Sequence, residues 1–175
     1  MNRREFLKKT LEGIFIGSIP LIYCSKNPVE SEPVNSNSYT YKNIEHYIQT
    51  DKSVYKLGEE IKILYRITNL RDEDMVLTFD ENDQNSKTNS IANFYIAPSG
   101  QDFSIWFNYG EPKMTTDSLI LQPKENKEFY ANWDMRHRDG KIYIDLGVYE
   151  VSAGIAPWVK NGFPAGVSTD INIIP

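Results

Sequence analysis

Apolar and polar residues alternate along much of the chain after residue 40, which is typical of β-strands with one buried face. The alternation is clearest in two neighbouring segments, whose apolar positions are Ile61, Ile63, Tyr65, Ile67, Met75, Leu77 and Phe79. A polar turn over 69–74 separates these segments. Together they predict an antiparallel hairpin whose apolar face needs a second sheet to cover it.

Shorter segments of similar character predict the other strands. They are 44–49, 94–97, 103–109, 118–122, 127–133, 148–155 and 169–174. Turn signals rich in Pro, Gly, Asp or Asn separate most of them, and no stretch after residue 40 has helical periodicity. Strands at this spacing predict an all-β sandwich or barrel over 41–175.

The strand pattern leads to predictions about the exposure of one histidine and of five aromatic side chains. We expect His46 to be a partly exposed strand residue and not a metal ligand. Aromatic residues in a β protein usually lie in its core. We therefore assign five of them to the core: Phe103, Trp106, Tyr130, Trp133 and Tyr149.

The first 23 residues have the layout of a bacterial export signal, with a basic start and an apolar run over 11–23. Thirteen helical residues would span only about 20 Å, against a hydrocarbon core of about 30 Å, so a membrane-spanning helix is not predicted. The start resembles the twin-arginine export motif, carried here by Arg3, Arg4, Phe6 and Leu7. That resemblance implies that the protein folds before it is exported.

Residues 21–24, Leu-Ile-Tyr-Cys, resemble a lipobox, in which the cysteine takes a diacylglycerol and becomes the new N-terminus. Tyr23 departs from the small residue that normally precedes the cysteine, so an ordinary signal with Cys24 incidental is the alternative. Acyl chains contribute about 0.8 kcal/mol per buried methylene, enough together to hold a protein on a membrane. We predict a signal peptide over 1–23, then the lipidated Cys24 and a disordered polar tether over 24–40.

The charge of the chain limits its partners. The formal net charge is −5, and removal of residues 1–23 takes away four basic and two acidic side chains to leave −7. An acidic surface without a Lys/Arg run repels phosphate backbones, so nucleic-acid binding is not expected. The membrane contact that we expect is the lipid anchor alone.

The residues available for chemistry argue against an enzyme. The chain has two histidines, His46 and His137, and one cysteine, Cys24. A His/Cys zinc site is not available once Cys24 is lipidated, and neither histidine lies in a recognisable nucleophile motif. We predict no catalytic residues, no metal site and no cofactor.

Two loops are candidates for binding another protein. Arg136, His137 and Arg138 form a compact cationic segment in an acidic chain, and Trp158 and Phe163 could supply aromatic anchors. The alternative is a solvated hairpin tip for the first loop and buried core aromatics for the second.

Several turn and core residues together resemble the intracellular proteinase inhibitor (BsuPI) domain over about residues 45–155. The residues that carry the resemblance are Tyr55, Gly58, Glu59, Ile61, Asn69, Leu77, Phe79, Trp133, Asp134, Asp139, Gly140, Gly147 and Tyr149. The resemblance implies an immunoglobulin-like antiparallel β-sandwich, which we predict with about eight strands, and inhibition of a serine protease. It supplies no inhibitory contact residues, and the family's named activity is intracellular whereas this chain carries an export signal.

These observations lead to one expected function and one alternative. We expect a lipid-anchored protein-binding module in the bacterial cell envelope, with a serine protease as its sharpest candidate partner. The alternative is a structural or assembly accessory protein of the envelope without inhibitory activity. Fold similarity alone does not distinguish the two.

Overall fold

The computed structural model describes residues 35–79, 90–114, 118–136, 144–156, 159–160 and 166–175. All of them belong to one compact unit, Glu32–Pro175. The predicted signal peptide, Cys24 and residues 25–34 lie outside the described residues. Within the described ranges, no helix is long and apolar enough to cross a membrane.

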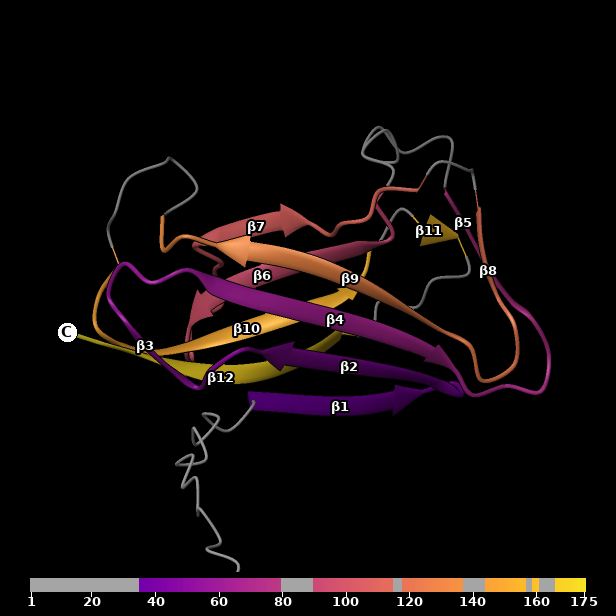
Figure 1. Cartoon of the computed structure of the whole chain (residues 1–175), viewed down its shortest axis with the longest axis horizontal. Helices are drawn as coiled ribbons and strands as arrows, with labels where there is room; N and C mark the ends of the chain where they lie inside the picture. The colour runs from indigo at the N-terminus through magenta and orange to yellow at the C-terminus, as the bar shows by residue number, and fades with distance from the viewer. Residues whose placement is uncertain (1–34, 80–89, 115–117, 137–143, 157–158, 161–165) are drawn as a thin grey trace, which may run out of the picture. The chain divides into compact units, whose positions relative to one another are not determined.

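The described chain consists of β-strands joined by turns (Figure 1). The strands are β1 (Asn35–Tyr41), β2 (Ile44–Thr50), β3 (Val54–Lys56), β4 (Ile61–Asn69), β5 (Met75–Phe79), β6 (Ala92–Pro98), β7 (Trp106–Tyr109), β8 (Ser118–Leu121), β9 (Asn126–Trp133), β10 (Gly147–Ile155), β11 (Val159–Lys160) and β12 (Gly166–Ile174). The all-β class is confirmed. The described ranges hold twelve strands where about eight were predicted, because β1 and the short β3 and β11 were not foreseen.

The strands form three sheets. Sheet A has the order β1-β2-β4-β9, sheet B the order β3-β12-β10-β6-β7, and a small sheet the order β11-β5-β8. Pairing is antiparallel throughout except between β12 and β3. The predicted hairpin of β4 with β5 was wrong, because β4 pairs with β2 and β9 whereas β5 pairs with β8 and β11. Sheet A lies in front of sheet B in Figure 1, so the two form the layers of a sandwich.

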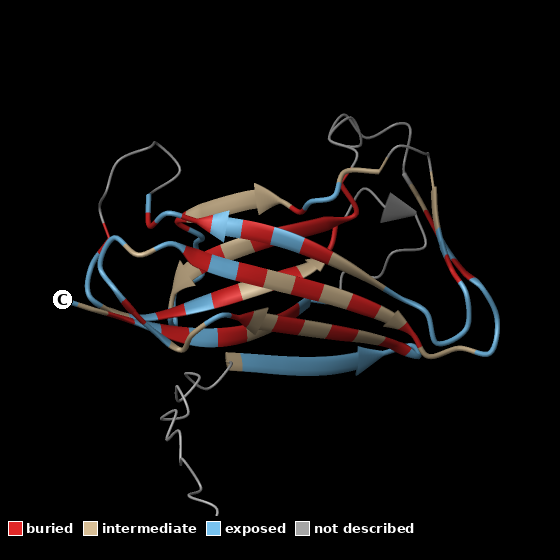
Figure 2. Cartoon of the chain, viewed as in Figure 1, coloured by how far each residue is buried: buried red, intermediate tan, exposed pale blue. Residues whose placement is uncertain are grey.

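The core lies between these layers and follows directly from the alternation in the sequence. In β4 every second residue from Ile61 to Asn69 is buried, and β2 shows the same period over Ile44–Thr50. Figure 2 shows the result as regular buried bands across β2, β4 and β9 of sheet A. A shift of one residue would turn the whole apolar set toward water, so this alternation fixes the register.

Aromatic side chains fill the centre of the core. Tyr65 packs edge-to-face against Phe94, with ring centroids 6.3 Å apart, and lies 6.2 Å from the ring of Phe129. Trp133 and Tyr149 are buried with ring centroids 6.0 Å apart, which confirms two of the core assignments. Trp106 is only partly buried and packs against the core near Trp133.

Two other core assignments were wrong. Phe103 is 58% exposed and precedes β7, which begins at Trp106 and not at residue 103. Tyr130 is 49% exposed because it alternates with Phe129 and Ala131, which face the core. Phe103 thus lies outside any strand, whereas for Tyr130 the position along the strand outweighs aromatic character.

The prediction for His46 was also wrong. His46 has an exposed fraction of 0% and lies on the inward face of β2, between Ile44 and Ile48. Its Nδ1 atom is 2.7 Å from the hydroxyl of Tyr65, while its Nε2 atom is buried without a hydrogen-bond partner. Burial lowers the pKa of His46 to about 4, so the ring is neutral at pH 7.

The predicted tether ends earlier than expected, because residues 35–40 belong to β1. This strand pairs with β2 over its whole length although its side chains are mostly exposed. Asn35 Nδ2 donates to the carbonyl of Asp170 at 2.6 Å, and Asn37 Nδ2 donates to the carbonyl of Ser168 at 2.8 Å. The two amides therefore connect β1 of sheet A to β12 of sheet B, which a polar composition alone did not indicate.

Candidate protein-binding surface

Of the loop residues predicted to bind a partner, only Arg136 is described by the structure. Its Nε atom pairs with a carboxylate oxygen of Asp134 at 3.1 Å, and its carbonyl accepts a hydrogen bond from Trp133 Nε1 at 2.9 Å. The adjacent Met135 is buried. Arg136 thus fixes the end of β9, and its charge is already paired. His137, Arg138, Trp158 and Phe163 lie outside the described residues.

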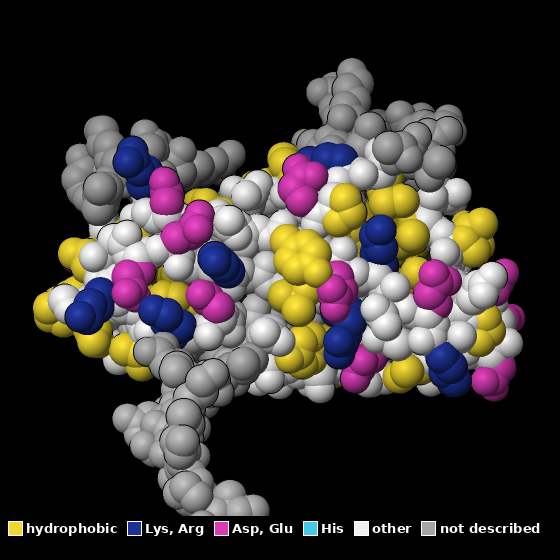
Figure 3. Space-filling model, viewed as in Figure 1, with side chains coloured by type: hydrophobic (Ala, Val, Ile, Leu, Met, Phe, Trp, Pro, Cys, Tyr) yellow, Lys and Arg dark blue, Asp and Glu magenta, His cyan; other side chains and the backbone are white. Residues whose placement is uncertain are grey.

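A different surface combines aromatic, aliphatic and charged side chains on the outer face of sheet A. Residues that alternate with the core positions of β2, β4 and β9 all point away from the sandwich. We call the central group of these residues the ladder face: Tyr47, Leu64, Arg66, Glu128 and Tyr130. In Figure 3 this region shows hydrophobic surface beside basic and acidic side chains.

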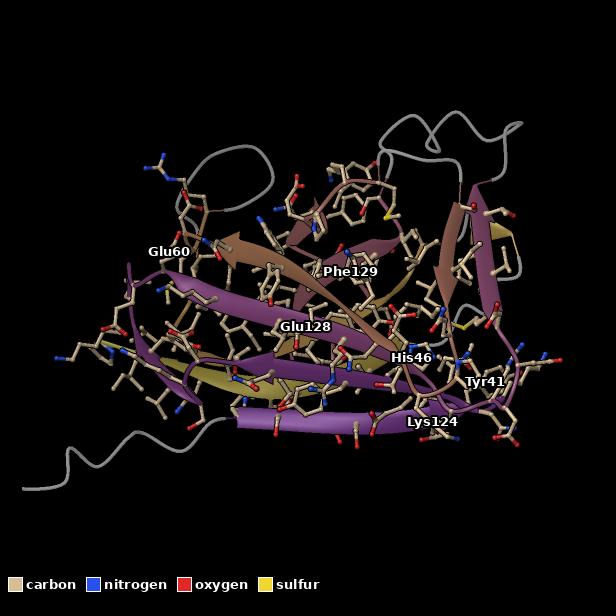
Figure 4. All side chains as sticks on the ribbon, turned by 45° about the vertical axis from the view of Figure 1, so that its right-hand side comes forward. Tyr41, His46, Glu60, Lys124, Glu128 and Phe129 are labelled. Carbon is tan, nitrogen blue, oxygen red and sulfur yellow. The ribbon has the colours of Figure 1, made fainter. Side chains whose placement is uncertain are left out.

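One row of the ladder face crosses three strands. Tyr47, Arg66 and Glu128 are direct neighbours in the registers of β2, β4 and β9. The guanidinium carbon of Arg66 lies 4.5 Å from the centroid of the Tyr47 ring, and Arg66 Nη1 lies 4.0 Å from Glu128 Oε1. Figure 4 labels Glu128 on β9 beside the buried Phe129. The arginine is therefore held between a ring and a carboxylate.

The neighbouring row places Gln49, Leu64 and Tyr130 side by side. The Tyr130 hydroxyl donates a hydrogen bond to Glu128 Oε2, and the Tyr47 hydroxyl donates one to Gln49 Oε1 at 2.8 Å. The hydrogen bond to Glu128 raises the pKa of Tyr130, because ionisation would lose it and place two negative charges together. Both rings thus have their polar ends fixed.

These interactions orient side chains more than they stabilise the fold. An exposed ion pair contributes about 0 to 1 kcal/mol and an exposed cation–π contact about 0.5 to 1 kcal/mol. Their effect is to restrict the rotamers of Tyr47, Arg66 and Tyr130 before any partner arrives, which reduces the entropy cost of binding. Tyr and Arg are also residue types enriched at the energetic centres of protein interfaces.

Sequence reasoning missed the ladder face, although the signal was present. Phe129, Ala131 and Trp133 have the spacing of one buried face, which places Tyr130 on the opposite one. The same period in β4 places Leu64 and Arg66 outward. The recognisable feature of this surface is an aromatic residue, Tyr130, at a strand position that alternates with the buried positions.

The described part of the chain contains no group of three or more His, Cys, Asp or Glu residues arranged to hold a metal ion. The buried His46 contacts the Tyr65 hydroxyl through Nδ1, and its Nε2 has no hydrogen-bond partner among the described residues. The ladder face is therefore the best-defined candidate site in the described residues.

Comparisons with known proteins give only distant structural similarities. No family model matches the chain, and no curated protein matches it. Spo0M, a sporulation control protein from Bacillus subtilis, aligns with a TM-score of 0.46 and 11% identity over 81% of this chain and 49% of its own. The β-glucosidase EmGH1 from Erythrobacter marinus aligns with a TM-score of 0.45 and 14% identity over 81% of this chain and 16% of its own.

The DNA glycosylase AlkC from Pseudomonas fluorescens aligns with a TM-score of 0.43 and 11% identity, over 70% of this chain and 28% of its own. The chain thus spans less than half the length of each of these three proteins. Similarities of this size carry no argument about activity, substrate or partner.

Proposed function

We propose that this chain is a lipid-anchored protein-binding module of the bacterial cell envelope, and that the ladder face is its binding surface. The observation that carries the proposal is the cross-strand arrangement of Tyr47, Arg66, Glu128 and Tyr130, which presents fixed aromatic and cationic groups on an exposed sheet. The module has no catalytic role of its own, holds no cofactor and does not bind nucleic acid.

Inhibition of a serine protease is the specific activity that we propose for this module. Its support is the resemblance of residues 45–155 to the BsuPI domain. Export and anchoring at Cys24 would place the target in the periplasm or at the outer surface. The alternative partner is a structural protein of the envelope, which the ladder face could bind equally well.

Anchoring has a direct test. Metabolic labelling with a radioactive fatty acid should mark the wild-type chain and should leave Cys24→Ala unmarked, because the diacylglycerol is attached through the Cys24 sulfur. Cys24→Ala should also leave the membrane fraction after export. Equal labelling of the two chains would exclude lipidation at this residue.

Partner binding is tested by site-specific photo-crosslinking in cells. Benzoylphenylalanine at Asn132, which is exposed on β9 two residues from Tyr130, should capture a partner. The same probe at the exposed Glu150 on β10 of sheet B is the matched control and should capture none. In the Asn132 probe chain, Tyr130→Ala should reduce capture at least about tenfold, the loss expected for an anchor worth more than 1.4 kcal/mol. Lys62→Ala, an exposed change on the same face, should leave it unchanged.

The identity of the captured protein separates the two functions. A serine protease that the purified chain inhibits at a one-to-one ratio supports inhibition, whereas a fixed envelope component supports the accessory role. Capture that is equal at Asn132 and Glu150, or unaffected by Tyr130→Ala, would show that the ladder face is not the binding surface.

A further inference from the structure

Strand β1 leaves a long edge of sheet A open among the described residues. Its sequence, Asn-Ser-Asn-Ser-Tyr-Thr-Tyr, contains no charged residue and no proline, and all of its residues except Asn35 are exposed. It pairs with β2 on one side, and sheet A ends there. Proteins usually protect such an edge with charge, proline, a bulge or a very short strand, because an unpaired strand is a template for another.

The backbone groups that face this open edge can be identified from the hydrogen bonds of β2. Leu70 N–H donates to the carbonyl of Asn43, and Asp51 N–H donates to the carbonyl of Lys62. Odd-numbered residues of β2 therefore bond to β4, and even-numbered ones bond to β1. Their partners on β1 are residues 35, 37, 39 and 41. The N–H and C=O groups of Ser36, Ser38 and Thr40 consequently point away from the sheet.

A side-chain contact supports this assignment. The N–H of Ser38 donates to Asn37 Oδ1 at 2.8 Å and not to a carbonyl of β2, and pairing with a second strand would replace this local bond. The three outward residues, 36, 38 and 40, are symmetric about Ser38. Antiparallel pairing with a second copy of the strand can therefore place a two-fold axis at Ser38.

The other sheet edges are less suitable for such pairing. The opposite edge of sheet A is β9, where Glu111 exchanges two backbone hydrogen bonds with Tyr130, at 2.7 and 3.0 Å. The edges of the remaining sheets are β3, β7, β8 and β11, which have two to four residues each. The edge of β1, with seven residues, is the longest one left open in the described chain.

We propose that two copies of this chain pair β1 with β1 about a two-fold axis at Ser38. Ser38 then lies opposite Ser38 of the second copy, and Ser36 opposite Thr40. On the other side of the strand, Tyr39 lies opposite Asn37 and Tyr41 opposite Asn35. None of these pairs contains a charged residue, so the acidic net charge of the chain causes no repulsion between the directly paired residues of the two β1 strands.

This pairing covers exposed apolar surface and doubles the candidate site. The rings of Tyr39 and Tyr41 are exposed and stack on each other with centroids 6.4 Å apart, and both lie in the strand that the second copy covers. The two four-stranded sheets become one continuous sheet with both ladder faces on the same side. The dimer does not depend on the proposed function, but it would let one assembly bind two partner molecules or a repeated one.

Disulfide trapping tests the dimer and its register together. The full-length chain carries Cys24→Ser, so that an introduced cysteine is the only thiol. With the axis at Ser38, the facing Cα atoms would lie roughly 5.5 Å apart, within the range of a disulfide. The two copies of Ser36 would lie roughly 14 Å apart along the strands, beyond that range. Under mild oxidation, Ser38→Cys should therefore form a covalent dimer at least about tenfold faster than Ser36→Cys.

A mixing experiment supplies the matched control. Ser36→Cys and Thr40→Cys chains should crosslink to each other when mixed and should crosslink slowly when kept apart. Equal rates for Ser38→Cys and Ser36→Cys, or for mixed and separate chains, would show random collision and overturn the proposal. If Ser38→Cys in cells forms crosslinked products with other proteins and none with a second copy of the chain, the proposal is overturned. The edge would then bind an extended segment of a different partner.

A second measurement does not depend on disulfide geometry. Ser38→Pro removes an N–H that β2 does not use, so the strand should stay paired with β2 while the open edge is blocked. Sedimentation velocity should show a dimer dissociation constant raised at least about tenfold, with an unchanged far-UV circular dichroism spectrum. If the wild-type chain is monomeric at every concentration measured, the proposal is overturned.

Discussion

Lowering the pH from 7 to 5 is expected to reduce the free energy of unfolding by about 2 kcal/mol through His46 alone. The ring has no exposed surface, and burial lowers its pKa from 6.5 to about 4. Protonation would place a charged ring in the core, where Nδ1 contacts the Tyr65 hydroxyl and Nε2 has no partner among the described residues. The cost of desolvating that charge favours the unfolded chain.

The direction of the effect follows from the two pKa values. Above pH 6.5 His46 is neutral in both the folded and the unfolded chain, and its contribution to stability is fully present. Between pH 6.5 and 4 the unfolded chain binds a proton that the folded chain does not, so stability falls as the pH falls. The loss reaches about 3 kcal/mol near pH 4, where the folded chain also begins to bind the proton.

Urea unfolding followed by tryptophan fluorescence at pH 7, 6 and 5 measures this dependence. His46→Gln keeps a polar partner for the Tyr65 hydroxyl but cannot titrate, so its stability should change little over the same range. His137→Gln is the matched control for the other histidine and should retain the wild-type slope. Parallel pH profiles for wild type and His46→Gln would contradict the prediction.

Replacement of Asn69 by alanine is expected to lower the free energy of unfolding by about 3 kcal/mol. Asn69 ends β4, has no exposed surface and lies between two turns. Its Nδ2 donates to the carbonyls of Glu73, Leu121 and Gln122 at 2.8, 2.9 and 3.2 Å, and its Oδ1 accepts from the N–H of Arg71 at 3.0 Å. Each backbone group left unpaired and buried costs about 1 to 3 kcal/mol, partly recovered where water can enter.

The same urea measurements test this prediction with two comparison variants. Asn69→Asp has the same shape but no N–H donors, and its buried carboxylate would face carbonyl oxygens, so it should lose at least as much stability as Asn69→Ala. Asn132→Ala removes an exposed amide from β9 and should stay within about 0.5 kcal/mol of wild type. A loss below 1 kcal/mol for Asn69→Ala would show that these hydrogen bonds are replaced by water.

The parts of the fold that the sequence predicts best are strands with a complete apolar face. In β4 and β5 large residues repeat with a period of two, and burial of apolar residues is the dominant stabilising term, so both strands were predicted correctly. Their pairing with each other was predicted wrongly, because strand partners depend on the whole fold and not on nearness in sequence. β1 lacks such a face. It is ordered by backbone pairing with β2 and by the amides of Asn35 and Asn37, and neither leaves an apolar pattern to recognise.

The candidate site was harder to predict because residue type and position in the alternation of the strand lead to opposite predictions of burial. Tyr130 is aromatic but outward, and His46 is titratable but inward. In both cases the phase set by neighbours on the same strand is the stronger constraint, since a strand cannot turn one side chain over without moving the rest. The cross-strand register that brings Tyr47, Arg66 and Glu128 together comes from pairing between distant segments and is not visible in any one of them.

The amides of Asn35 and Asn37 also determine how the domain resists mechanical force. A pull along the chain from its N-terminal side reaches the first described strand, β1, at Asn35. A pull across the sheet would separate β1 from β2 one residue pair at a time, starting at Asn35. A pull along the strand would instead strain all seven residue pairs together. The two side-chain bonds to β12 lie where such unzipping would start. The strand is therefore reinforced at the point where tension from a membrane attachment would first reach it.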